Sequence, residues 1–550
     1  MTKEQKDNLF VLIKSLSKSE KRQFKLYVGR IGVNEDSKFL LLFTVLQKLK
    51  TYDEAAVLKH GFVKKEQLSN LKAHLYKQIL ISLRLNPSHQ NIRIQIREQL
   101  DFATILYHKG LYTQSLKILD KAKSLAISNE EKNIAYEIIE LEKVIEGQYI
   151  TRSMSNRADK LTVQAQELSQ HNLLASKLSN LSLQLYGEFL KTGFVKQASE
   201  HEKITKYFND RLPVYKIAEL GFREKLWLYK SYLWYSFLIQ DFLGCYKYSK
   251  KWVDLFHEHP GMIKLNPVFF LNGYQNLLEA LFFVKQHEKF KEILGSLIGI
   301  TDEDGFPKDD NVQSLTFLYV GSNKFNAHFM EGTFKEGLPL IPETLEGIRK
   351  HKTRIDEHHV MVFYYKIASL YFGIGEHQKC IDFLDKIISN KSLQMREDLL
   401  CFSRILNLVA HYEAGLDYNL EALIKSTYKF LIKMEDLYLV QKEMIKFLRN
   451  LGEIYPNELR SEFIKLHKKL KIYEDHPYES RAFLYLDVIS WLESKIENKS
   501  VDRIIKTKFQ KIYGLSKSDN SVFNLKNNLN WEPKDDLTEF YNKHQNFNVK

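Results

Sequence analysis

Residues 363–388 carry two short runs of apolar positions with helical spacing, separated by a glycine. In the first run Ile367, Ala368 and Tyr371 fall on one helical face, and the small Ala368 leaves room for a neighbouring helix. Gly375 interrupts this run. The second run recurs at intervals of three and four residues, and it comprises His377, Cys380, Leu384 and Ile387. The pattern therefore predicts two helices that pack against each other across a tight turn.

The same pattern occurs earlier in the chain. Its matching positions are, in order, Phe102, Ala103, Leu106, Gly110, Tyr112, Ser115, Leu119 and Ala122. Weaker copies turn at Gly147, Gly193, Gly332 and Gly415, and near Gln240 and Glu288. Helical pairs of this kind bury their apolar faces by stacking on their neighbours. We therefore expect a chain of stacked helical pairs.

These residues resemble the tetratricopeptide-repeat (TPR) family, which has a small residue in the first helix, a turn glycine, and a small and then a large residue in the second helix. The resemblance implies an all-α fold, namely a right-handed α-solenoid of degenerate helix-turn-helix repeats whose first helices line a concave groove. A TPR unit has about 34 residues, whereas HEAT and armadillo units have about 40 to 47. The turns here lie roughly 37 to 48 residues apart, so the subclass of helical repeat stays open.

The sequence predicts four segments. Residues 1–90 form a basic helical module, because their apolar stripes lack the repeat pattern. Residues 91–436 form the TPR-like solenoid. Residues 437–515 lose the repeat register and are expected to be helices that cap the exposed face of the last repeat. Residues 516–550 are rich in asparagine and predict a mobile tail.

Composition agrees with a long helical protein. The 550 residues include only ten prolines and 23 glycines, and 44% are hydrophobic. Cys245, Cys380 and Cys401 are far apart, so the sequence encodes neither a disulfide framework nor a zinc ribbon. The N-terminus is charged where a signal peptide would be apolar, and no apolar run is long enough to span a bilayer. We expect a cytoplasmic protein that is not associated with a membrane.

The net charge of +13 is unevenly distributed. Residues 1–100 hold 19 Lys and Arg against nine Asp and Glu, a net of +10. Residues 499–550 hold ten against six, and the region between is nearly neutral. A basic end on a neutral body fits an anionic partner at that end, although a solvated surface explains it equally well.

A basic patch is predicted within this N-terminal region. Ser17 and Glu20 can form a capping box that opens a helix over residues 18–31. At about 100° per residue, four cations of this helix fall within one arc. They are Lys18, Lys21, Arg22 and Lys25.

Motifs of catalysis and cofactor binding are absent from the sequence. No Walker A loop, dinucleotide-binding glycine motif, HExxH, nucleophile elbow or kinase signature occurs. His257 and His259 would point about 200° apart on a helix, and no third ligand is apparent. We therefore expect no metal site, no cofactor and no enzymatic activity.

Groove positions in a TPR-like array lie thirteen, ten, six and three residues before the turn residue. In three units these positions hold aromatic rings with a few polar groups, the composition of protein-binding hot spots. The candidate groove residues are Trp227, Lys230, Trp234, Phe237, Tyr319, Asn326, Phe329, Tyr365 and Phe372. The alternative is that these rings pack between neighbouring units. The groove lacks the rows of Lys and Arg that bind a peptide C-terminal carboxylate in some family members.

Two functions follow as hypotheses. The first is a non-enzymatic cytoplasmic adaptor or scaffold that binds a protein or peptide partner through the solenoid groove. The second is a nucleic-acid or ribonucleoprotein-associated factor that uses the basic N-terminal module. Ionic strength distinguishes them, because affinity based on phosphate contacts falls steeply with salt.

Overall fold

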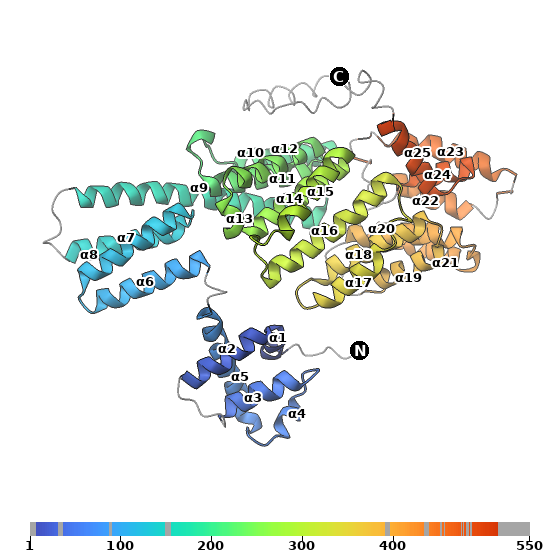
Figure 1. Cartoon of the computed structure of the whole chain (residues 1–550). Coiled ribbons are helices and arrows are strands. Elements are labelled where there is room, and N and C mark those ends of the chain that lie inside the picture. Colours follow the sequence, from blue (N-terminus) through green and yellow to red (C-terminus); the bar gives the residue numbers. More distant parts are fainter. Residues whose placement is uncertain are drawn as a thin grey trace. The chain divides into compact units, whose positions relative to one another are not determined.

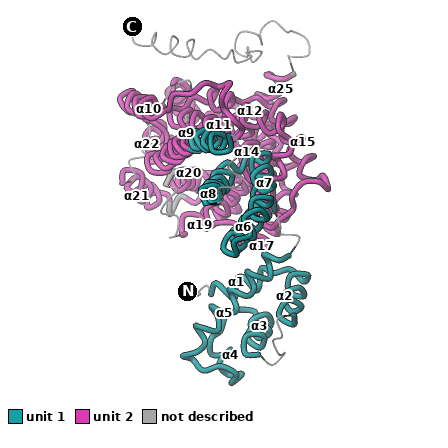
Figure 2. Tube along the Cα trace, turned by 90° about the vertical axis from the view of Figure 1, so that its left-hand side faces the viewer, with its two compact units in different colours: residues 1–172 teal, residues 173–550 magenta. Residues whose placement is uncertain are grey.

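The computed structural model of the chain describes residues 7–30, 37–86, 91–148, 156–390, 397–433, 439–450, 454–455, 457–474, 476, 478–479, 483 and 487–514. These residues form 25 α-helices and one short 3-10 helix, and none of them lies in a strand (Figure 1). The expected all-α fold is confirmed. The predicted tail at 516–550 lies outside the described residues. The chain divides into two compact units, residues 1–172 and 173–550 (Figure 2).

Unit 1 contains helices α1 to α8 and the first part of α9. Their bounds are α1 (Asn8–Ser15), α2 (Lys18–Arg30), α3 (Lys38–Lys48), α4 (Glu54–Leu58), α5 (Lys65–Arg84), α6 (Ile92–His108), α7 (Tyr112–Ser128), α8 (Lys132–Gln148) and α9 (Arg157–Thr192). The unit has two cores. Side chains of α1 to α5, including Phe24 and Phe43, form the first. Side chains of α6 to α9, including Ile96 and Leu119, form the second.

Unit 2 contains the rest of α9 and all later helices. Their bounds are α10 (Ala198–Arg211), α11 (Phe222–Leu238), α12 (Phe242–Glu258), α13 (Gly261–Leu265), α14 (Pro267–Phe283), α15 (His287–Asp302), α16 (Asp310–Glu331), α17 (Leu340–Lys350), α18 (Glu357–Gly373), α19 (His377–Ile388), α20 (Glu397–Glu413), α21 (Asp417–Lys433), α22 (Leu439–Asn450), α23 (Leu459–Lys471), α24 (Val488–Glu497) and α25 (Val501–Gly514). The 3-10 helix spans Ile217–Glu219 and precedes α11.

Consecutive helices of unit 2 pack as pairs joined by short turns. The pairs are α11 with α12, α14 with α15, α16 with α17, α18 with α19, and α20 with α21. Each turn contains one residue with positive φ, namely Gln240, Lys285, Gly332, Gly375 and Gly415. A left-handed residue at this place ends the first helix and reverses the chain. Glycine adopts that conformation without strain, whereas Gln240 and Lys285 carry a Cβ there.

One predicted turn borders residues outside the described ranges, and another is displaced. Gly147 is the next-to-last residue of α8, and residues 149–155, which follow this helix, lie outside the described residues. The turn expected near Glu288 is at Lys285. This shift changes which residues of α14 correspond to the candidate groove positions.

Three hydrophobic cores run through unit 2. Side chains from α9 to α16 form the largest, around Trp252 and Tyr274. A smaller core joins α16, α17 and α18, and Ile505 of α25 packs against it. The third extends from α18 to α24, around Phe463 and Trp491. Helices α22 to α24 thus share a core with the α18 to α21 pairs, whereas α25 also packs on α16.

Candidate functional site

The nine candidate groove residues all lie on α11, α16 and α18, the first helices of three pairs in unit 2. Five of them are half-buried, namely Trp227, Lys230, Trp234, Tyr319 and Phe329. Four are buried, with at most 8% of their surface exposed, namely Phe237, Asn326, Tyr365 and Phe372. These four offer little surface to a partner.

Trp234 lies in an aromatic cluster that joins α11 to α9. Its ring centroid is 4.6 Å from that of Tyr186 on α9 and 5.6 Å from that of Phe237. The Ser231 hydroxyl donates a hydrogen bond of 3.0 Å to the Leu178 carbonyl, also on α9. The second half of α9 therefore packs beside α11 as a further helix of this series.

Lys230 points its ammonium group at aromatic rings. The nitrogen is 4.6 Å from the ring centroid of Trp227, 5.1 Å from that of Phe269 and 5.4 Å from that of Trp252. Rings attract a cation through their quadrupoles. No carboxylate of the described residues forms an ion pair with Lys230, and burial lowers the pKa of the ammonium group to about 8.

Helix α14 carries polar residues that the sequence analysis missed. With Lys285 as the turn residue, the positions thirteen, ten and six residues earlier are Asn272, Gln275 and Glu279. All three are half-buried. The available signal was their spacing of three and four residues within an otherwise apolar helix.

A chain of amide hydrogen bonds connects α18, α16 and α14. The Lys366 ammonium donates to Asn326 Oδ1 at 2.5 Å, and Asn326 Nδ2 donates to Asn323 Oδ1 at 3.1 Å. Asn323 Nδ2 donates both to Gln275 Oε1, at 2.8 Å, and to the Tyr319 carbonyl, at 2.9 Å. An ammonium can only donate and a carbonyl can only accept, so both ends fix the orientation of these amides. The Gln275 Nε2 group is consequently a donor without an acceptor in the described part of the chain.

Tyr319 fixes a second amide of α14. Its hydroxyl donates to Asn272 Oδ1 at 2.5 Å. Burial, with smaller contributions from the neighbouring Tyr186 and Glu279, raises the pKa of Tyr319 to about 12, so the phenol keeps its proton. The Asn272 Nδ2 group has no hydrogen-bond acceptor among the described residues.

Lys366 on α18 is, like Lys230 on α11, a half-buried cation. Its nitrogen lies 5.8 Å from the ring centroid of Phe329. Burial lowers the pKa of Lys366 to about 8, and the negative charge of Glu279 partly opposes this effect. The available hydrogen-bonding groups of Lys230, Asn272, Gln275 and Lys366 are thus all N–H donors, and we call these four residues the donor row.

The predicted basic patch lies on α2 of unit 1. The predicted capping box is confirmed, because Ser17 N donates to Glu20 Oε2 at 2.6 Å and Glu20 N donates to Ser17 Oγ at 3.2 Å. Of the four patch residues, Lys21 is half-buried and the others, Lys18, Arg22 and Lys25, are exposed. Within the described ranges none of the four forms an ion pair.

Electrostatics in unit 1 agree with a concentration of positive charge near α2. The pKa of Lys14 on α1 is lowered, first by burial and then by the positive charge of Lys21. The Lys14 ammonium donates a hydrogen bond of 2.8 Å to the Gln47 carbonyl at the end of α3. Lys14 therefore extends the patch toward α3.

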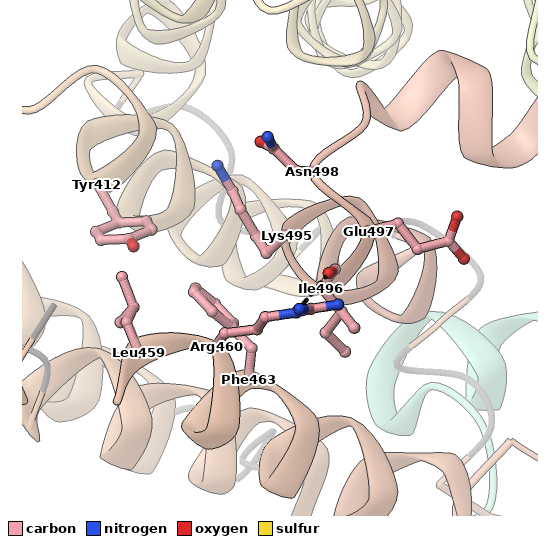
Figure 3. A pocket seen from close by; sticks show the side chains of 8 residues that line it. All are labelled: Tyr412, Leu459, Arg460, Phe463, Lys495, Ile496, Glu497 and Asn498. Atoms are coloured by element: carbon pink, nitrogen blue, oxygen red, sulfur yellow. Dashed lines mark hydrogen bonds between the residues drawn. The ribbon is translucent and has the colours of Figure 1, made fainter. Parts of the chain in front are cut away.

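A pocket of about 490 Å³ lies elsewhere in unit 2, between the ends of α20, α23 and α24 (Figure 3). Arg460 closes one side by donating a hydrogen bond of 3.0 Å to the Ile496 carbonyl. Lys495 is paired with Glu413, which also accepts a hydrogen bond of 2.6 Å from Trp491 Nε1. The charged groups of Arg460, Lys495 and Glu497 that line this pocket are thus used by the fold, and we assign it no ligand.

Other kinds of site were also considered. Across the described ranges no group of three or more His, Cys, Asp and Glu side chains is arranged to hold a metal ion. No helix in the described part of the chain has the length and apolar character needed to cross a membrane. The chain matches no protein-family model, no curated protein and no solved structure.

Proposed function

We infer that this protein is a non-enzymatic cytoplasmic adaptor that binds a partner protein through the first helices of its unit 2 pairs. In this proposal the pairs stack as a right-handed α-solenoid of TPR-like repeats, and the first helices face its groove. The left-handed residue that recurs in each turn supports stacking, since the same turn conformation gives successive pairs a similar arrangement of their two helices. The three cysteines are buried and form no disulfide in the described part of the chain, which is compatible with a reducing compartment.

The observation that carries the proposal is the donor row beside half-buried aromatic rings. Lys230, Asn272 and Gln275 are half-buried and keep N–H donors without an acceptor among the described residues. None of these donors is a fully buried atom, so a ligand can reach them, and Lys230 lies beside the rings of Trp227 and Phe269. Rings and hydrogen-bonding groups in this combination are typical of surfaces that bind proteins.

Site-specific photo-crosslinking tests the proposal. A photoreactive phenylalanine analogue at Trp227 should form covalent adducts with a defined set of proteins in cells. The same analogue at Glu288, a residue of the second helix α15 with 78% of its side chain exposed, is the matched control. Mass spectrometry should find partner proteins attached at position 227 and not at position 288. Equal adducts at both positions, or none at either, would contradict an adaptor role for this surface.

A second candidate function is binding of nucleic acid by unit 1. The supporting observation is that Lys18, Lys21, Arg22 and Lys25 share one helix and form no ion pair with a described carboxylate. Unpaired cations on one helical arc can neutralise successive phosphates. This function and the adaptor function use different units, so each can be tested without the other.

A further inference from the structure

We propose that a corner between α11 and α14 binds a single acidic side chain, with an apolar side chain next to it, from an internal segment of a partner protein. The corner consists of Trp227 and Lys230 on α11 and of Phe269 and Asn272 on α14. The proposal rests on the adaptor function inferred above and names the chemistry that the partner presents.

Short contacts hold the corner together. The Lys230 ammonium lies 4.6 Å from the ring centroid of Trp227 and 5.1 Å from that of Phe269, and the centroids of these two rings are 5.5 Å apart. Asn272 follows Phe269 by three residues on α14, so their side chains are neighbours on one helical face. All four residues are half-buried. The rings, the ammonium group and the amide therefore lie within one helical turn of α14.

Both polar groups of the corner act as donors. Asn272 Oδ1 accepts a hydrogen bond from the Tyr319 hydroxyl, so the Nδ2 group is the part that a ligand can use. The ammonium of Lys230 can only donate. A ligand must therefore present oxygen acceptors: a carboxylate for Lys230, because a charge-assisted hydrogen bond is the stronger one, and a main-chain carbonyl for Asn272. Gln275, one turn further along α14, offers another N–H donor, so an internal segment uses more of this surface than a chain end does.

The charges around the corner limit the ligand to one acid. Burial is the only cause that lowers the pKa of Lys230, and no described carboxylate pairs with it. Glu279 lies on the same face of α14 as Asn272, seven residues later, which is about 10 Å of helix. Its negative charge raises the pKa of Lys366 against the effect of burial, so Glu279 acts at the far end of the donor row. A second acidic side chain placed there would be repelled by Glu279, and so would the next phosphates of a nucleic-acid strand.

A peptide array probed with labelled full-length protein tests this inference. Each peptide is a twelve-residue Gly/Ser chain, acetylated and tethered through its C-terminus so that no terminal carboxylate contributes. The probe peptide carries Glu-Leu at positions 6 and 7, and the comparison peptides carry Gln-Leu or Glu-Ser there. We expect the Glu-Leu peptide to retain about tenfold more protein than either, because Gln lacks the charge and Ser lacks the apolar contact with the rings.

Two further peptides test the limit to one acid. Each keeps Glu-Leu and adds a second Glu, at position 2 or at position 10. Neither should retain more protein through the corner than the Glu-Leu peptide does, because one direction along α14 leads to Glu279 and the other leads away from the donor row. Retention through the corner is the difference between the wild type and Lys230→Met.

Variants of the protein locate the binding. Lys230→Met should lower retention of the Glu-Leu peptide to the level of the Gln-Leu peptide. Asn272→Asp keeps the acceptor that Tyr319 uses but replaces the donor by a carboxylate, and it should have the same effect. The control is Lys289→Met, which removes a half-buried lysine 5.7 Å from the Tyr246 ring on a second helix, α15. Its retention should equal that of the wild type. Circular dichroism verifies that each variant is folded.

Several results would overturn the inference: equal retention of the Glu-Leu and Gln-Leu peptides, an equal loss in Lys289→Met, a larger retention of a Gln-Leu peptide with a free C-terminal carboxylate, or an oligouridine whose binding is lost in Lys230→Met. If one of them occurs while proteins still crosslink at position 227, the adaptor function stands and only the acidic assignment fails. If the Glu-Leu peptide binds as expected but no protein crosslinks at that position, the adaptor function itself fails.

Discussion

The phenol of Tyr513 donates a hydrogen bond of 2.7 Å to the main-chain carbonyl of Lys285, 228 residues earlier in the chain. The same hydroxyl accepts a hydrogen bond of 3.2 Å from the amide of His287. Lys285 is the left-handed residue between α14 and α15. Helix α25 is therefore hydrogen-bonded to the turn that ends α14. The ring of Phe509, also on α25, packs edge-on against His287 at 4.6 Å between centroids.

Removing α25 should therefore destabilise unit 2. A chain that ends after Ser500 loses Ile504, which is buried, and the Phe509 and Tyr513 rings. We expect a loss of on the order of 2 to 4 kcal/mol, from the apolar area that becomes exposed. A chain that ends after Leu515 keeps α25 and is the control. Thermal unfolding followed by circular dichroism should show a lower midpoint only for the shorter chain, and two equal midpoints would contradict a structural role of α25.

Gly332, in the turn between α16 and α17, provides a more local test of how α25 packs on unit 2. Its φ is +70°, and a Cβ there would lie 2.6 Å from the Lys506 amide nitrogen of α25. Gly375 has a φ of +84° but no atom within 4 Å of such a Cβ. Gly375→Ala should cost about 1 kcal/mol from left-handed strain alone. Gly332→Ala should cost about 2 kcal/mol more, since α25 must shift. Equal losses in chemical denaturation would show that α25 does not press on this turn.

The candidate groove aromatics should separate into two groups when truncated. Phe237 is 3% exposed and belongs to the largest core, so Phe237→Ala should lower stability by about 3 to 5 kcal/mol. Trp227 is half-buried, and Trp227→Ala should reduce partner binding by about 2 kcal/mol with a smaller loss of stability. The measurement is a pair of denaturation curves with the corresponding binding isotherms. A large stability loss for both variants would assign both rings to the core.

Lys366 should make the stability of unit 2 depend on alkaline pH. Its folded-state pKa of about 8 is lower than its ordinary value of 10.5, so the unfolded chain binds more protons between these pH values. The free energy of unfolding of the wild type, relative to Lys366→Met, should therefore rise from pH 8 to pH 10.5. We expect a rise of about 1 to 2 kcal/mol, less than the full shift implies, because the Lys366 side chain is partly exposed. Denaturation of both proteins at several pH values measures it, and a constant difference would contradict the lowered pKa.

The apolar pattern was sufficient to predict the all-α fold, because helical spacing is visible even where individual repeats are degenerate. It placed the turn after α11 correctly, at the left-handed Gln240. It failed on α14, because Lys285 adopts a left-handed conformation that glycine usually marks in a sequence. The turn was placed three residues too late, and the candidate groove positions were derived only for α11, α16 and α18, so Asn272 and Gln275 of α14 were missed. The burial of Phe237 follows the stated alternative that these rings pack between neighbouring helices, and local spacing did not single it out because it depends on contacts with α9.

The basic patch offers the clearest separation of the two candidate functions. Changing Lys18, Lys21, Arg22 and Lys25 together to Gln removes four positive charges that have no described ion-pair partner, so the melting temperature should change little. If unit 1 binds nucleic acid, wild-type protein should bind a short RNA or DNA with an affinity that falls steeply between about 50 and 200 mM salt. The quadruple variant should bind weakly and with a flatter salt dependence. Lys230→Met in unit 2 is the matched control and should retain the wild-type salt slope. A wild-type protein that does not bind either nucleic acid at low salt would leave the donor row as the remaining candidate site.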